Sequence, residues 1–117
     1  YIMVKHGNPP YLECSSRGEK RLSAFYAKVN GKIIEDQYQA FKIFEGGVTG
    51  LGWRAAKGKK AINHEECLKF YSQLWDQYID ANPDLLILIK NASGLSDMFG
   101  KQGHACQATE LWRIRNK

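Results

Sequence analysis

The stretch IIEDQYQAFKIF, residues 33–44, decides the fold because the hydrophobic pattern changes its period there. Before it, short apolar segments alternate with turn residues, which is typical of strands. Within it, apolar residues recur every three or four positions and predict an amphipathic helix anchored by Ile34, Tyr38, Phe41 and Phe44. The two glycines that follow end the helical pattern.

A polar edge runs along this predicted helix. At about 100° per residue, Gln39 lies about 40° from Glu35 around the helix, and Lys42 about 20° from it on the other side. The three side chains therefore border the apolar face, a position from which they can line a cleft. They also suit a solvated edge, because the macrodipole favours a carboxylate near a helix start and Glu35 with Gln39 is an ordinary i,i+4 pair. The periodicity leaves both interpretations open.

The flanking segments predict a single α+β domain over residues 1–117. A small sheet formed early and followed by several helices is an α+β arrangement, and 117 residues suit one domain with its own core. Strands are predicted at 1–4, 11–15 and 22–29, with a hairpin turn at Asn30-Gly31. Further on, the patterns predict one or two helical turns within 49–61, a helix over about 64–81, another from residue 83, a loop over 93–103 and a final helix over 105–115.

The net charge and the basic clusters indicate which kinds of molecule the protein could bind. The net charge is +5 and the pI about 9.2. Basic residues form two short clusters, RGEKR at 17–21 and KGKK at 57–60. Such clusters suit solubility, and they also suit attraction to phosphate on a nucleic acid or on a nucleotide-like small molecule.

The cysteines and the apolar runs indicate the cellular compartment of the protein. Three widely spaced cysteines without a CxxC pair predict free thiols in a reducing compartment, so we expect a cytoplasmic protein. The longest apolar run, LLILI at 85–89, is far shorter than the ~18 residues of a membrane span, and no signal peptide is visible. His104 and Cys106 could share a metal, but two ligands without a second pair make a poor site. We expect no metal and no cofactor.

The segment RLSAFYAKVNGKIIEDQYQAFK, residues 21–42, resembles the opening signature of the NADAR family of YbiA-like N-glycosidases. In that family Leu-Ser-Asn-Phe-Tyr leads through a strand and a turn to Glu-His-x-(Tyr/Phe)-Gln-Ala-x-Lys on a helix. The matching residues here are Leu22, Ser23, Phe25, Tyr26, Glu35, Tyr38, Gln39, Ala40 and Lys42. AAKGKK resembles the family's Ala-x-x-Leu-Gly-Arg stretch, and residues 97–115 resemble its closing motif, which places Asp97, Phe99, Gly100, Leu111 or Trp112, and Arg115. The motifs follow in the same order from about residue 22 to the end.

The chain departs from the family pattern at several positions. Ala24 stands where the family has asparagine, Asp36 where it has histidine, and Phe99 where it has tryptophan. Near the last helix, Gln107 replaces an asparagine and Glu110 a glycine. The chain therefore resembles a compact, divergent member whose substrate could differ.

The resemblance implies a metal-independent hydrolase that cleaves the ribose–base bond of an ADP-ribosylated guanine or nucleotide, or of a related phosphoribosyl compound. Glu35 would stabilise the oxocarbenium-like state and activate water. Lys42 would either hold phosphate or attack an opened ribose as a Schiff base. Asp97 would be a second carboxylate or would cap a turn. Substrate contacts are expected from Gln39, Tyr26, Trp53, Phe99, Gly100, Arg17, Arg21 and Lys57.

The expected partner is an anionic nucleotide-like small molecule or an ADP-ribosylated nucleic acid. One alternative is a non-catalytic module that binds ADP-ribose or another NAD-derived nucleotide without turnover. Another is a basic nucleic-acid-binding domain, whose affinity would depend strongly on salt.

Overall fold

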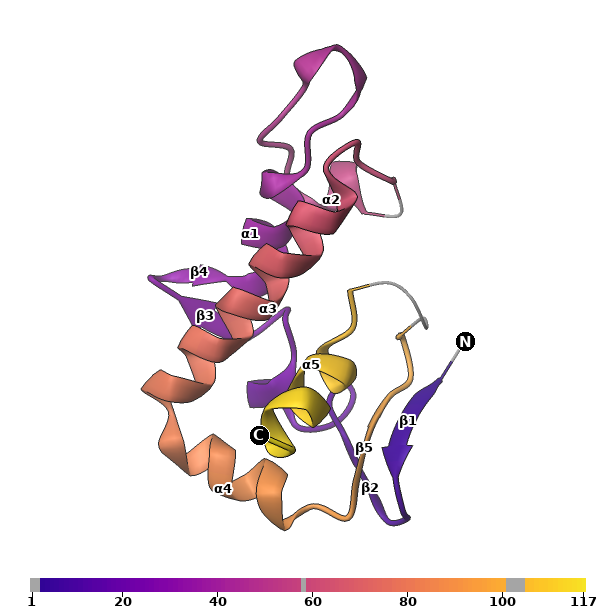
Figure 1. The fold of residues 1–117 in the computed structure, drawn as a ribbon, viewed down its shortest axis with the longest axis vertical. Coiled ribbons are helices and arrows are strands. Elements are labelled where there is room, and N and C mark those ends of the chain that lie inside the picture. The colour runs from indigo at the N-terminus through magenta and orange to yellow at the C-terminus, as the bar shows by residue number, and fades with distance from the viewer. Residues whose placement is uncertain (1–2, 58, 101–104) are drawn as a thin grey trace.

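A computed structural model describes residues 3–57, 59–100 and 105–117 and shows the predicted α+β architecture (Figure 1). Its largest element, α3, runs diagonally through the molecule and connects the part that holds α1 and α2 with the part that holds α4, α5 and the main sheet (Figure 1). The strands are β1 (Val4–Gly7), β2 (Tyr11–Glu13), β3 (Lys28–Val29), β4 (Lys32–Ile33) and β5 (Gly94–Asp97). The α-helices are α1 (Ile34–Phe41), α2 (Trp53–Ala56), α3 (His64–Ala81), α4 (Pro83–Asn91) and α5 (Gln107–Arg115), and 3₁₀ helices span Lys20–Leu22 and Glu45–Gly47.

The main sheet has the order β1-β5-β2, so its central strand comes from the segment that the sequence predicted as a loop. β5 pairs antiparallel with β1, placing Val4 opposite Asp97, and parallel with β2, placing Tyr11 opposite Gly94. The loop prediction is wrong here because the glycine, serine and aspartate of this segment are turn residues by local preference. Pairing with two strands distant in sequence buries all four residues of β5 and overrides that preference.

The predicted strand over 22–29 is also wrong over most of its length. Residues 23–27 form turns, in which the Ser23 carbonyl accepts hydrogen bonds from the backbone N–H groups of Tyr26 (3.0 Å) and Ala27 (2.8 Å). Only β3 forms a strand within this range, and it pairs with β4 through the predicted hairpin turn. Asn30 (φ 55°) and Gly31 (φ 83°) both adopt the left-handed conformation that such a two-residue turn requires.

The core lies along α3. Cys67, Tyr71, Leu74 and Trp75 of this helix are buried, and they pack between α1 on one side and α5 on the other. Tyr71 makes an edge-to-face contact with Tyr38 of α1, with 5.0 Å between ring centroids. The fold thus sets α1 firmly against the centre of the molecule. Within the described residues, no helix combines the length and the apolar character needed to cross a membrane.

Candidate active site

The turn before α1 fixes the position of Glu35. The Ile34 N–H donates to the Ala27 carbonyl (2.9 Å) and the Glu35 N–H donates to the Ala24 carbonyl (3.0 Å). These are first-turn donors that have no partner inside the helix itself. Because the turn at 23–27 supplies their acceptors, it determines where the helix begins and where the Glu35 side chain emerges.

Glu35 and Gln39 are hydrogen-bonded to each other, and the charge of Lys42 acts on Glu35. The Gln39 amide nitrogen Nε2 donates to Glu35 Oε1 at 2.7 Å. Gln39 is 3% exposed and Lys42 5% exposed, and Glu35 is half-buried. A solvated stripe would leave such side chains in water. The burial therefore excludes the solvated-edge interpretation that the periodicity left open.

The set of buried side chains on α1 differs in part from the sequence prediction. Ile34 and Tyr38 are buried, as predicted for anchors. Phe41 was predicted to be a third anchor, and this is wrong, because its side chain is 41% exposed and stacks on Phe70 with 4.5 Å between centroids. The helix ends at Phe41, and Lys42 continues in an extended conformation (φ −63°, ψ 136°). This change of direction turns the Lys42 side chain inward.

Lys42 ties α1 to the segment around α2. Its Nζ donates to the Lys59 carbonyl (2.9 Å) and to the Ala56 carbonyl (3.3 Å), and it lies 5.3 Å from the centre of the Tyr38 ring. Burial lowers the pKa of Lys42, and the negative charge of Glu35 opposes that shift. The ammonium group is thus held by backbone carbonyls within reach of the Glu35 charge.

The Glu35 carboxyl binds its proton more tightly than an ordinary glutamate. Burial raises its pKa, and the hydrogen bond from Gln39 and the charges of Lys57 and Lys42 counteract part of the rise. A raised carboxyl pKa beside positive charges is the environment in which a carboxyl can act both as acid and as base near neutral pH.

This raised pKa predicts a pH-dependent stability difference between the protein and Glu35→Gln. Between pH 4.5, the ordinary value, and the raised pKa, the folded state binds the Glu35 proton more tightly than the unfolded chain does, so stability falls as pH rises through this window. Glu35→Gln lacks this loss. Urea unfolding at about pH 4 and about pH 7 should show the variant gaining stability relative to the parent protein at the higher pH. A difference that does not change with pH would contradict the assignment.

Phe25, Trp53, Arg54 and Lys57 form an aromatic and basic cluster. The Phe25 and Trp53 rings meet edge to face, 5.1 Å apart, and Lys57 Nζ lies 5.4 and 5.7 Å from their respective centroids. The Arg54 guanidinium carbon lies 5.0 Å from the centre of the Trp53 ring. The Lys57 charge also acts on Glu35, so one predicted substrate contact, Lys57, influences the carboxyl, and another, Trp53, lies beside Lys57.

Phe25 is the residue that sequence reasoning did not place in the site. The prediction named its neighbour Tyr26, which is 50% exposed and has the Lys20 ammonium 5.3 Å from its ring. The available signal was the Leu-Ser-x-Phe-Tyr match, which contains both aromatics. The turn at 23–27 decides which of them meets Trp53.

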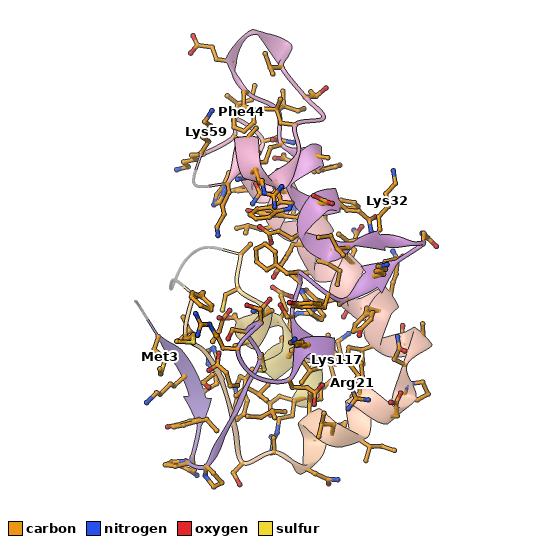
Figure 2. All side chains as sticks on the ribbon, turned by 180° about the vertical axis from the view of Figure 1, so that it is seen from behind. Met3, Arg21, Lys32, Phe44, Lys59 and Lys117 are labelled. Carbon is orange, nitrogen blue, oxygen red and sulfur yellow. The ribbon has the colours of Figure 1, made fainter. Side chains whose placement is uncertain are left out.

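Arg21 and Arg17 were both predicted to contact the substrate. Arg21 pairs with Glu19 (3.0 Å) and Asp84 (3.4 Å) and lies toward the opposite end of the molecule from Lys59, whose carbonyl holds Lys42 (Figure 2). The structure therefore does not bring Arg21 to Glu35. Arg17 is exposed, and its backbone N–H donates to Ser15 Oγ at 3.2 Å.

Asp97 caps the turn that follows β5. One carboxylate oxygen accepts the Phe99 N–H at 3.0 Å, and the other lies 3.6 Å from Cys106 Sγ. Burial raises the pKa of Asp97. Burial also raises the pKa of Tyr71, and the charges of Glu35 and Asp97 add to that rise. The charges of both carboxylates therefore act on the Tyr71 hydroxyl.

Gly100 is required by close packing in the same turn. A Cβ at this position would lie 2.8 Å from Cys106 Sγ, 3.1 Å from Val4 Cγ2 and 3.3 Å from Asp97 Cβ. The neighbouring Phe99 is 46% exposed, so the structure gives Gly100 a packing role and leaves Phe99 at the surface.

We expect Gly100→Ala to lower the free energy of unfolding by about 1–3 kcal/mol, because the added methyl group overpacks the contact with Cys106. Urea titration measures the loss. Gly52→Ala is the matched control, since a Cβ there meets nothing within 4 Å, and it should change stability by no more than about 0.5 kcal/mol. Equal free energies of unfolding for the two variants would show that the turn accommodates the added methyl group without losing stability.

Two of the positions that depart from the family pattern are in direct contact. The Ala24 N–H donates to Gln107 Oε1 at 2.8 Å, and both residues are buried. This hydrogen bond connects the start of α5 to the turn whose carbonyl at Ala24 also accepts the Glu35 N–H. Gln107 thus supports, through the backbone of Ala24, the turn before α1.

The described ranges contain no group of three or more His, Cys, Asp or Glu side chains that could hold a metal ion. Cys106 is buried beside Asp97. His104, the other member of the pair considered as a metal site, lies outside the described residues.

No family model, curated protein or solved structure matches this chain. The functional argument therefore depends on the side chains gathered around Glu35 and on the motifs quoted above.

Proposed function

We propose that the protein is a NADAR-like N-glycosyl hydrolase that cleaves the bond between ribose and a base nitrogen in an ADP-ribosylated guanine or nucleotide, or in a related phosphoribosyl compound. The observation that carries the proposal is that the buried Gln39 and Lys42, at the end of α1, lie around the half-buried Glu35, to which Gln39 donates and on which the Lys42 charge acts. In the resemblance these residues belong to a single helical motif, and this arrangement is what a cleft wall needs.

The chemistry requires a proton at the leaving base and negative charge near the anomeric carbon. When the carbon–nitrogen bond breaks, its electron pair leaves with the base nitrogen, and positive charge develops on the sugar ring. A protonated Glu35 donates its proton to the base. The resulting carboxylate stabilises the cationic sugar and then takes a proton from water as the water oxygen bonds to the anomeric carbon. The products are free base and the ribose hydroxyl, and Glu35 regains its proton.

The lysines and aromatic rings would bind the anionic substrate. Lys42 already donates two hydrogen bonds to carbonyls. An ammonium group can donate three, so one donor remains for a substrate oxygen. This favours a charged contact over nucleophilic attack, which needs the neutral amine. Trp53 and Phe25 offer ring surfaces for the base, with Lys57 and Arg54 beside them to attract phosphate.

The test is turnover of a guanine conjugate of ADP-ribose, followed by mass spectrometry. The proposal expects free guanine base and ADP-ribose to accumulate with time. Conjugate that is bound tightly and recovered intact would overturn the hydrolase and support the binding module. The buried Ala24–Gln107 contact, at positions where the family has asparagine in both places, is the observation that favours this alternative.

A further inference from the structure

We propose that Gln39 recognises the hydroxyl on the sugar carbon adjacent to the anomeric carbon, so that the site accepts ribose and rejects 2-deoxyribose. This inference rests on the proposed function, because it assumes that Glu35 faces the anomeric carbon. It names the sugar that the site takes and the residue that selects it.

The evidence is an acceptor that lacks a donor. Gln39 Oε1 is buried and has no hydrogen-bond partner among the described residues. Native proteins rarely leave such an atom unpaired, and each instance calls for a physical explanation. Since the whole side chain is 3% exposed, bulk water does not replace the missing donor. A bound molecule with an O–H or N–H group would complete the site.

The orientation of the amide follows from Glu35. The Nε2 group donates to Glu35 Oε1 at 2.7 Å, and a carboxylate accepts hydrogen bonds but cannot donate them. Once Glu35 has given its proton to the base, nitrogen must therefore face it, and the amide oxygen diverges from the same carbon atom. The unpaired atom is an acceptor held rigidly beside the proposed catalytic carboxylate.

The sugar supplies a donor at the right place. If the carboxylate of Glu35 faces the anomeric carbon, an acceptor on the side chain hydrogen-bonded to it lies near the adjacent carbon of the ring. In ribose that carbon carries a hydroxyl, and in 2-deoxyribose it carries none. Hydrogen bonds to this hydroxyl strengthen as charge develops on the sugar, which makes them useful in glycoside cleavage. A site with a fixed buried acceptor discriminates strongly against a ligand that leaves it unpaired.

The experiment compares ADP-ribose with its analogue lacking the 2-hydroxyl of the terminal ribose, by calorimetric titration. The wild-type protein should bind ADP-ribose at least about tenfold more tightly. In Gln39→Met, which removes the acceptor at similar volume, the two affinities should become about equal. Gln73→Met on the exposed face of α3 should keep the wild-type preference. A purely structural role for Gln39 would not alter the ratio of the two affinities.

Equal binding of the two compounds by the wild-type protein would overturn the inference, and this arm depends on no variant. Full preference retained in Gln39→Met would overturn it as well. A clear preference without turnover of the guanine conjugate would support the role of Gln39 while rejecting the hydrolase. Failure to bind either compound would reject both the proposed function and the inference.

Discussion

Replacing Glu35 by glutamine should lower the turnover of an ADP-ribosylated guanine by about 10²–10⁴-fold, the usual contribution of a positioned acid–base group. Glutamine keeps the shape of the side chain and can still accept the hydrogen bond from Gln39, but it neither donates a proton to the base nor removes one from water. The protein should fold normally, because the change removes a carboxyl whose burial raises its pKa. Initial rates of guanine release measure the effect.

The matched control for this variant is Glu65→Gln, at an exposed position in the first turn of α3. It makes the same chemical change away from the proposed site, so its rate should equal that of the parent protein. If Glu35→Gln folds and keeps full activity, Glu35 is not the catalytic acid–base group.

The second large effect is expected from Lys42→Met, which should lower the free energy of unfolding by about 2–4 kcal/mol. The change removes the Lys42 donor from the Lys59 carbonyl and from the Ala56 carbonyl, which keeps the Lys59 N–H at 3.1 Å. It also removes a positive charge that acts on Glu35. Urea titration measures the loss. Turnover should also fall, because the link between α1 and the segment carrying Trp53 and Lys57 is broken.

A double-mutant cycle separates the loss of the Lys42 hydrogen bonds from the loss of its charge near Glu35. Combining Lys42→Met with Glu35→Gln should cost less than the sum of the single changes, because a neutral glutamine no longer needs a positive neighbour. Lys60→Met, at an exposed position in the same loop, should leave stability nearly unchanged. A Lys42→Met protein as stable as the parent would show that the buried ammonium does not hold α1 in place.

Local signals explain what was predictable in the fold. The helix predicted over about 64–81 is α3, and the Asn30-Gly31 hairpin forms, because periodicity and turn chemistry act within a few residues. The central strand β5 was not predictable in this way. Its residues favour turns, and it becomes a strand only because β1 and β2 pair with it across most of the chain length.

In the candidate site, too, local signals predicted some features, and contacts distant in sequence determined others. Helical spacing placed Glu35, Gln39 and Lys42 on one edge. In the structure Gln39 donates to Glu35, and the charges of Glu35 and Lys42 act on each other. Spacing could not show that α1 ends at Phe41, which turns Lys42 inward and leaves Phe41 exposed. Proximity of Trp53 and Lys57 to Glu35 likewise depends on how the loop after α1 returns.

The positions of Arg21 and Ala24 depend on contacts with residues that are distant in sequence. Arg21 pairs with Asp84, 63 positions away, and Ala24 with Gln107, 83 positions away. Neither contact leaves a local pattern in the sequence. For Arg21 the result is a charge held toward α4, and for Ala24 it is a backbone support beneath Glu35.

The most direct test of the central claim is a crystal structure of the protein with ADP-ribose bound. The proposed function expects the terminal ribose against α1, with a Glu35 carboxylate oxygen about 3–3.5 Å from the anomeric carbon, a distance at which reacting atoms meet. ADP-ribose bound elsewhere, with Glu35 remote from the anomeric carbon, would contradict the assignment of this face as the active site.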